Sequence, residues 1–92
     1  MKTPKIKELP VEFEGRGEMK GFHFKQLIKN PKAYLYEVTH PDTDIIDYEV
    51  FNRRVYKPNN REIYPRGESF GYTAWSYRNK ENALKKLQEI SV

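Results

Sequence analysis

Cysteine is absent from this chain of 92 residues, and large aliphatic and aromatic core formers are few. Without cysteine there can be no disulfide framework, no thiolate nucleophile and no cysteine-ligated zinc. Leucine, isoleucine, valine and phenylalanine together supply only 21 residues, so the hydrophobic core is small. The composition predicts one domain of marginal stability, or one that a protein partner or a second copy of the chain stabilises.

Long apolar segments are also missing. No aliphatic run exceeds two residues, as at Ile45-Ile46, so we expect no membrane span. The first ten residues, MKTPKIKELP, contain no apolar stretch of the kind found in signal peptides. A small secreted domain would usually need disulfides. We therefore expect a cytoplasmic protein.

Residue types that perform catalysis are scarce. The chain has three serines, none in a G-x-S-x-G motif, and two histidines, His23 and His40. His23 lies between two phenylalanines of an alternating pattern, which points it toward solvent, and His40 precedes a proline in a turn. The sequence therefore predicts a protein that is not an enzyme.

Two patterns that could indicate a cofactor have the wrong spacing. The glycines at 15, 17 and 21 miss the G-x-G-x-x-G pattern by one residue, and we interpret them as a hairpin loop. Four acidic residues lie close together in the sequence, but position 46 is isoleucine where a calcium-binding EF-hand loop needs an acid or amide. These four residues, interpreted as a solubilising turn with a bound cation as the alternative, are Asp42, Asp44, Asp47 and Glu49. We predict no cofactor.

Alternation of apolar and polar residues indicates β-strands over most of the chain. Leu9, Val11 and Phe13 alternate with glutamates, for example. Near the C-terminus, an apolar stripe with helical spacing follows Asn79, a residue suited to capping a helix. Further strand patterns cover residues 22–28, 33–40, 45–56, 61–64 and 69–78.

These patterns predict an α+β fold: a curved antiparallel β-sheet of four to six strands with a C-terminal helix, residues 79–90, packed on one face. We predict a flexible N-terminal tail over residues 1–8 and a single domain over 9–92. The predicted core comprises Val11, Phe13, Phe22, Phe24, Leu35, Val50, Phe51, Trp75, Leu84 and Leu87.

Residues 53–80 combine positive charge with aromatic rings. This stretch has seven basic and two acidic residues, a net charge of +5 against +4 for the whole chain, and six aromatic residues. Such a mixture suits phosphates and nucleobases, and it equally suits a half-buried sheet with a solvated outer face. The candidate nucleic-acid-binding residues are Arg53, Arg54, Lys57, Arg61, Arg66, Tyr56 and Tyr64.

Four segments, YLYEV (34–38), YEVFNRRV (48–55), SFGYTAWSY (69–77) and ALKKL (83–87), resemble small uncharacterised α+β proteins of phages and mobile elements of gut bacteria. The resemblance covers roughly residues 9–90 and implies no activity. The chain also resembles WGR domains, which are DNA-associated modules. Their Trp-Gly-Arg signature corresponds to Asn52-Arg53-Arg54, so only an arginine is shared and no site is implied.

The sequence thus predicts a small non-enzymatic binding protein that associates with nucleic acid through a basic and aromatic edge of the sheet. The alternative is a protein–protein interaction module or a phage or accessory protein, whose surface would be an exposed strand edge with tyrosines.

Overall fold

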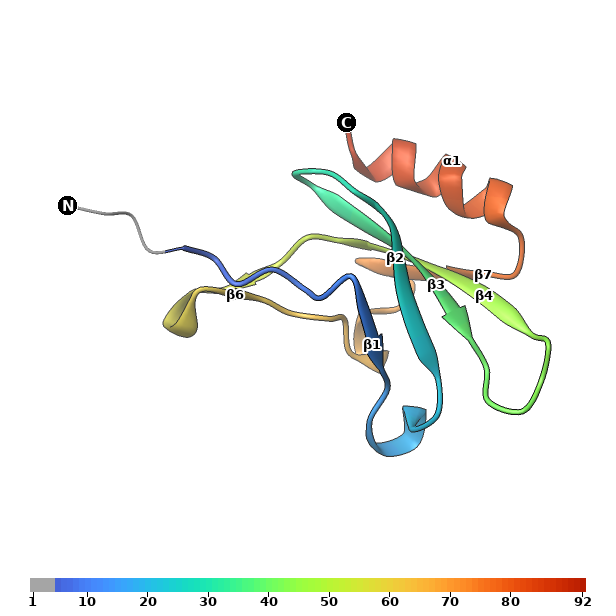
Figure 1. The fold of residues 1–92 in the computed structure, drawn as a ribbon. Helices are drawn as coiled ribbons and strands as arrows, with labels where there is room; N and C mark the ends of the chain where they lie inside the picture. Colours follow the sequence, from blue (N-terminus) through green and yellow to red (C-terminus); the bar gives the residue numbers. More distant parts are fainter. Residues whose placement is uncertain (1–4) are drawn as a thin grey trace.

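A computed structural model describes residues 5–92 of the chain, and it confirms the predicted α+β fold (Figure 1). The main sheet is antiparallel throughout, with neighbouring strands in the order β1-β2-β3-β4-β7. Its strands are β1 (Glu12–Glu14), β2 (His23–Lys29), β3 (Ala33–Thr39), β4 (Ile46–Asn52) and β7 (Ala74–Tyr77).

One face of the sheet carries the helix α1 (Lys80–Ile90). The side chain of Asn79 accepts hydrogen bonds from the backbone N–H groups of Glu81 and Asn82, which confirms the predicted cap. Ala83 and Leu87 of the helix are buried against a sheet surface formed by Ala33, Leu35 and Val50. This helix is too short to be stable alone, so packing on the sheet holds it in place. Among residues 5–92, no helix is both long and apolar enough to cross a membrane.

The opposite face of the sheet carries an aromatic cluster. Tyr34 and Tyr36 of β3 are fully buried there, beside Phe51 at ring-centroid distances of 5.6 and 5.7 Å. The core predicted from the sequence does not include these two tyrosines, which are buried because β3 is sandwiched between two apolar layers. Val11 is 62% exposed rather than in the core, since it lies just before the edge strand β1.

The chain leaves the main sheet after Asn52 and forms a separate ribbon. β5 (Val55–Tyr56) and β6 (Arg61–Glu62) pair with each other, and a 3₁₀ turn, η2 (Lys57–Asn59), joins them. Apolar residues of both parities occur in β4 because both faces of this strand are covered: Val50 packs under the helix and Phe51 in the aromatic cluster. Two further 3₁₀ turns are η1 (Gly17–Met19), between β1 and β2, and η3 (Gly67–Ser69), before β7.

An N-terminal segment lies along this ribbon. The backbone N–H of Lys7 donates to the carbonyl of Asn60, and the N–H of Glu62 donates to the carbonyl of Lys7, both at 2.8 Å. Lys7 falls within the predicted tail of residues 1–8, of which residues 1–4 lie outside the described part of the chain. We refer to residues 5–9 and 53–66 together as the basic arm, which projects from the sheet at the left of Figure 1.

Candidate functional site

Most of the protein's excess positive charge lies in the basic arm. The arm contains seven basic and two acidic residues, a net charge of +5 against +4 for the whole chain. Both acidic side chains are ion-paired, Glu8 with Lys29 and Glu62 with Arg53. Six cations remain exposed and form no ion pair within residues 5–92: Lys5, Lys7, Arg54, Lys57, Arg61 and Arg66.

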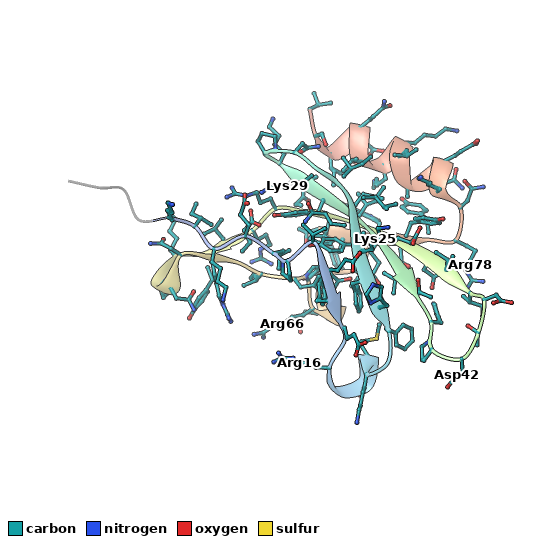
Figure 2. All side chains as sticks on the ribbon, in the orientation of Figure 1. Arg16, Lys25, Lys29, Asp42, Arg66 and Arg78 are labelled. Carbon is teal, nitrogen blue, oxygen red and sulfur yellow. The ribbon has the colours of Figure 1, made fainter. Side chains whose placement is uncertain are left out.

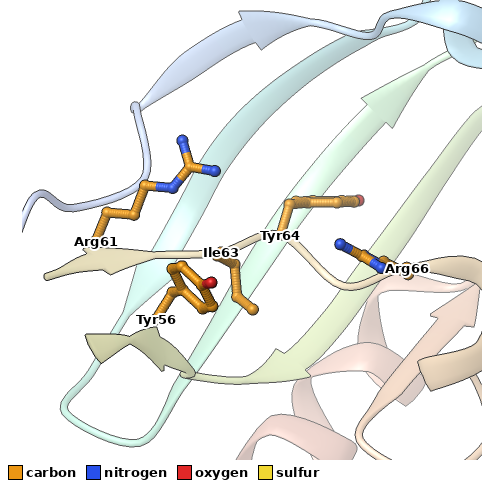
Figure 3. Close-up of a pocket in the computed structure, with 5 residues that line it drawn as sticks. All are labelled: Tyr56, Arg61, Ile63, Tyr64 and Arg66. Atoms are coloured by element: carbon orange, nitrogen blue, oxygen red, sulfur yellow. The ribbon is translucent and has the colours of Figure 1, made fainter. Parts of the chain in front are cut away.

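A pocket of about 520 Å³ lies against the arm (Figure 3). The β5–β6 ribbon contributes Tyr56 and Arg61 to its lining, and the segment after β6 contributes the other side chains. A smaller neighbouring cavity of about 240 Å³ adds Arg54 and the exposed acidic residue Glu68 to the same surface. The pocket, which we call the arm pocket, is lined by Tyr56, Arg61, Ile63, Tyr64 and Arg66.

Arg53 does not belong to the exposed set. Its Nε donates to Oε2 of Glu62, a residue that is 4% exposed. Oε1 of Glu62 also accepts hydrogen bonds from the hydroxyl of Tyr34 and, at 3.0 Å, from the backbone N–H of Leu9. Burial raises the pKa of Glu62, but these hydrogen bonds outweigh it and hold the pKa below its usual range. Ionised Glu62 thus links the two segments of the arm, residues 5–9 and 53–66, to each other and to β3.

Tyr64 is part of the aromatic cluster as well as of the pocket. Its ring meets Phe51 edge-on at 5.1 Å and Phe24 at 5.3 Å, with Phe13 and Tyr36 slightly farther away. Its hydroxyl is buried and has no hydrogen-bond partner among residues 5–92. Tyr64 is therefore a fixed wall of the arm pocket, whereas Tyr56, 49% exposed, presents an accessible ring.

The C-terminal half of the basic and aromatic stretch lies elsewhere. Nε of Arg78 is 2.5 Å from Oδ1 of Asp47, and Figure 2 shows Arg78 at the right of the molecule, apart from Arg66 at its lower centre. Trp75 is half-buried, with Nζ of Lys86 4.3 Å from its ring centroid. Residues 53–80 therefore do not form one continuous surface, and the candidate site is confined to the arm.

A second group of ionisable side chains lies around β4. Nε2 of His40 is 2.6 Å from Oδ2 of Asp47, and Nε of Arg78 is 2.5 Å from the other carboxylate oxygen, Oδ1. Burial raises the pKa of Asp47, but the hydrogen bonds from His40 and Arg78 outweigh it and lower the pKa. Glu49 is buried, and its Oε1 has no hydrogen-bond partner within residues 5–92. Burial, with a smaller effect from the charge of Asp47, raises the pKa of Glu49 to about 7.

These acidic side chains do not gather as a ligand set. Asp42 and Asp44, from the acidic turn, are exposed. Among residues 5–92, no three histidine or acidic side chains lie close enough together to hold a metal ion.

The sequence does not identify four residues of the arm. Its pattern places Lys5 and Lys7 in the tail and does not single out Glu62 or Ile63. The pattern of residues 61–64 indicates a short strand but does not show that Glu62 is buried. The partners that bury it, Leu9 and Tyr34, are 53 and 28 residues away in the sequence.

No protein-family model matches the chain, and no curated protein or solved structure is significantly similar to it. The resemblance to phage and mobile-element proteins therefore stays an expectation.

Proposed function

We propose that this protein is a non-enzymatic binding protein that associates with nucleic acid through the basic arm. The observation that carries the proposal is the concentration on one projecting arm of exposed cations that form no ion pair within residues 5–92, beside the accessible ring of Tyr56. Of the seven residues that the sequence predicts for this role, four line the arm pocket and Arg54 lines the adjoining cavity. Lys57 is exposed in η2, at the turn of the ribbon.

The charge arrangement suits a polyanion. Exposed cations that contact phosphates release condensed counterions, which favours binding at low salt. Arginine can also donate two parallel hydrogen bonds to one phosphate, and three of the cations along residues 53–66 that remain exposed are arginines. Because the acidic side chains of the arm are ion-paired, they offset little of this attraction.

The test is fluorescence anisotropy with labelled single-stranded DNA, RNA and duplex DNA, each titrated at several salt concentrations. Each phosphate contact makes the slope of log K against log[salt] more negative by about 0.7 to 0.9, so contacts from Arg54, Lys57, Arg61 and Arg66 predict a slope of about −2.8 to −3.6. Changing Arg54, Lys57 and Arg61 together to alanine should reduce the magnitude of the slope by about 2 to 3.

A matched control removes the same charge elsewhere. Lys25, Lys80 and Lys85 are exposed and lie outside the arm, so their combined replacement by alanine should leave most of the affinity and slope intact. Equal losses in both triple variants would indicate attraction to the net charge rather than an interface on the arm. No binding to any of the three nucleic acids at low salt would refute the proposal.

A protein partner is the second candidate. The observation that favours it is Tyr72, which is 81% exposed in the turn before the outermost strand β7. Tyrosines beside a strand edge are typical of protein interfaces. Binding of this kind would weaken when Tyr72 is changed to alanine and would depend little on salt.

A further inference from the structure

We infer that the arm binds an unpaired strand and that the arm pocket receives one of its bases, with the flanking phosphates on Arg61 and Arg66. This inference rests on the proposed function and names its ligand class. It follows from the shape and lining of the arm pocket rather than from the charge of the arm alone.

The arm pocket combines the two features that a nucleotide needs. Tyr56 supplies an accessible aromatic ring from β5, and Ile63 supplies an apolar neighbour from the segment after β6 (Figure 3). Arg61 on β6 precedes Ile63 and Tyr64, and Arg66 follows them, so the two arginines lie on opposite sides of these residues (Figure 3). A base in the pocket would therefore have a cation available on either side of it.

The pocket wall is already ordered. Tyr64 is held by edge-on contacts with rings of the aromatic cluster, and its ring-centroid distance to Phe51 is 5.1 Å. The backbone N–H of Ile63 donates to the carbonyl of Arg54 at 3.1 Å, which ties the segment after β6 to the start of the ribbon. Binding would therefore immobilise mainly Tyr56 and the two arginines, so little conformational entropy would be lost.

A concave pocket of this kind discriminates against duplexes. In a duplex the base faces are stacked on one another, and only base edges and the backbone are accessible. A base can lie on Tyr56 only if it is unstacked, as in a single strand or a loop. Arg54 and Lys57 lie outside the lining of this pocket. A single strand carries several phosphates and can contact these two residues while one of its bases fills the pocket. A free nucleotide cannot reach both places at once, so it should bind more weakly than a strand.

The experiment compares a single-stranded oligonucleotide containing 2-aminopurine with the same oligonucleotide in a duplex, and adds adenosine monophosphate as competitor. We expect the single strand to bind more tightly than the duplex and the fluorescence of 2-aminopurine to be quenched on binding. Tyr56→Leu should weaken single-strand binding about 5- to 150-fold, the equivalent of about 1–3 kcal/mol per stacked base. Tyr56→Phe keeps the ring and should bind like the wild type.

Thermal unfolding of both variants shows whether the arm remains folded, and Tyr56→Phe is the matched control. Duplex binding as tight as single-strand binding, unaffected by Tyr56→Leu but weakened by the triple alanine variant of the arm, would overturn the inference and leave the proposed function standing. Equal competition by the mononucleotide would also overturn it, since the pocket would then be a site for free nucleotides. No binding of any probe would overturn both.

Discussion

Glu62 and Glu49 are both buried carboxylates, yet their hydrogen-bond partners and neighbouring charges differ. Glu62 accepts hydrogen bonds from Arg53, Tyr34 and the backbone of Leu9. Glu49 lies on β4 opposite Tyr36 and Ser76, and its Oε1 accepts no hydrogen bond from the described residues. The pKa of Glu62 is consequently below its usual range, whereas that of Glu49 is raised to about 7.

The difference shows that burial alone does not determine whether a carboxyl is charged. Donors on three separate segments make the charge of Glu62 favourable, so this residue stabilises the attachment of the basic arm. The charge of Glu49 is unfavourable, since burial and the neighbouring charge of Asp47 both oppose it. The same substitution, glutamate to glutamine, should therefore have opposite effects at the two positions.

Glu62→Gln should have the largest effect. A neutral amide cannot balance the charge of Arg53, and removing one partner of a buried ion pair costs roughly 3–5 kcal/mol. Because Arg53 is partly exposed, we expect the free energy of unfolding at pH 7.5 to fall by about 3 to 4 kcal/mol, measured by urea denaturation.

The pH dependence checks the cause of this loss. A carboxyl whose folded-state pKa is lowered contributes stability above its unfolded-state pKa, and this contribution is lost as the pH falls through the folded-state value. The wild type and Glu62→Gln should therefore approach each other in acid. Equal stability of the two proteins at pH 7.5 would show that the ionised side chain of Glu62 does not stabilise the attachment of the arm to the sheet.

Glu49→Gln should stabilise the protein at alkaline pH. With its pKa raised from 4.5 to about 7, Glu49 contributes stability below about pH 4.5 and loses it as the pH rises through 7. Removing the charge should raise the free energy of unfolding by about 2 to 3 kcal/mol at pH 8.5, and by much less at pH 4.5. A lower stability of Glu49→Gln at pH 8.5 would contradict the assignment of Glu49 as an unfavourable buried charge.

Tyr34→Phe should have the smallest effect of the three. It removes one hydrogen bond to an ionised group, worth about 1.5–3 kcal/mol, and leaves the buried ring in place. The pKa of Glu62 should rise, so acid unfolding should begin at higher pH. Tyr36→Phe is the matched control, because its hydroxyl donates to the carbonyl of Pro10 at 2.6 Å and not to a carboxylate. An equal shift of the acid transition in both variants would mean that Tyr34 does not influence Glu62.

Local pattern was sufficient to predict the sheet and the helix. Alternation identifies the strands because one face of each is apolar, and Asn79 marks the start of α1 through its own side chain. β3 was assigned as a strand, but the burial of Tyr34 and Tyr36 was missed. Tyrosine is common on half-exposed surfaces, and only the second apolar layer, which comes from distant parts of the chain, buries these rings.

The candidate site was predicted less completely, for a related reason. Composition identifies a basic segment, but whether an arginine is free depends on which carboxylate reaches it. Arg53 is ion-paired because the ribbon turns back and brings Glu62 beside it. Lys7 joins the arm through backbone hydrogen bonds, which leave no signature in side-chain chemistry.

The hydrogen bond between Leu9 and Glu62 also constrains the order of folding. It joins residues 53 positions apart, so closing it carries the entropy cost of a long loop, and contacts this distant in sequence slow folding. The arm can acquire its final geometry only after its two segments, residues 5–9 and 53–66, have come together beside β3. We expect pulse-labelled hydrogen exchange during refolding to protect the β3–β4 amides before those of Lys7 and Glu62, which would make the arm the last part of the molecule to form.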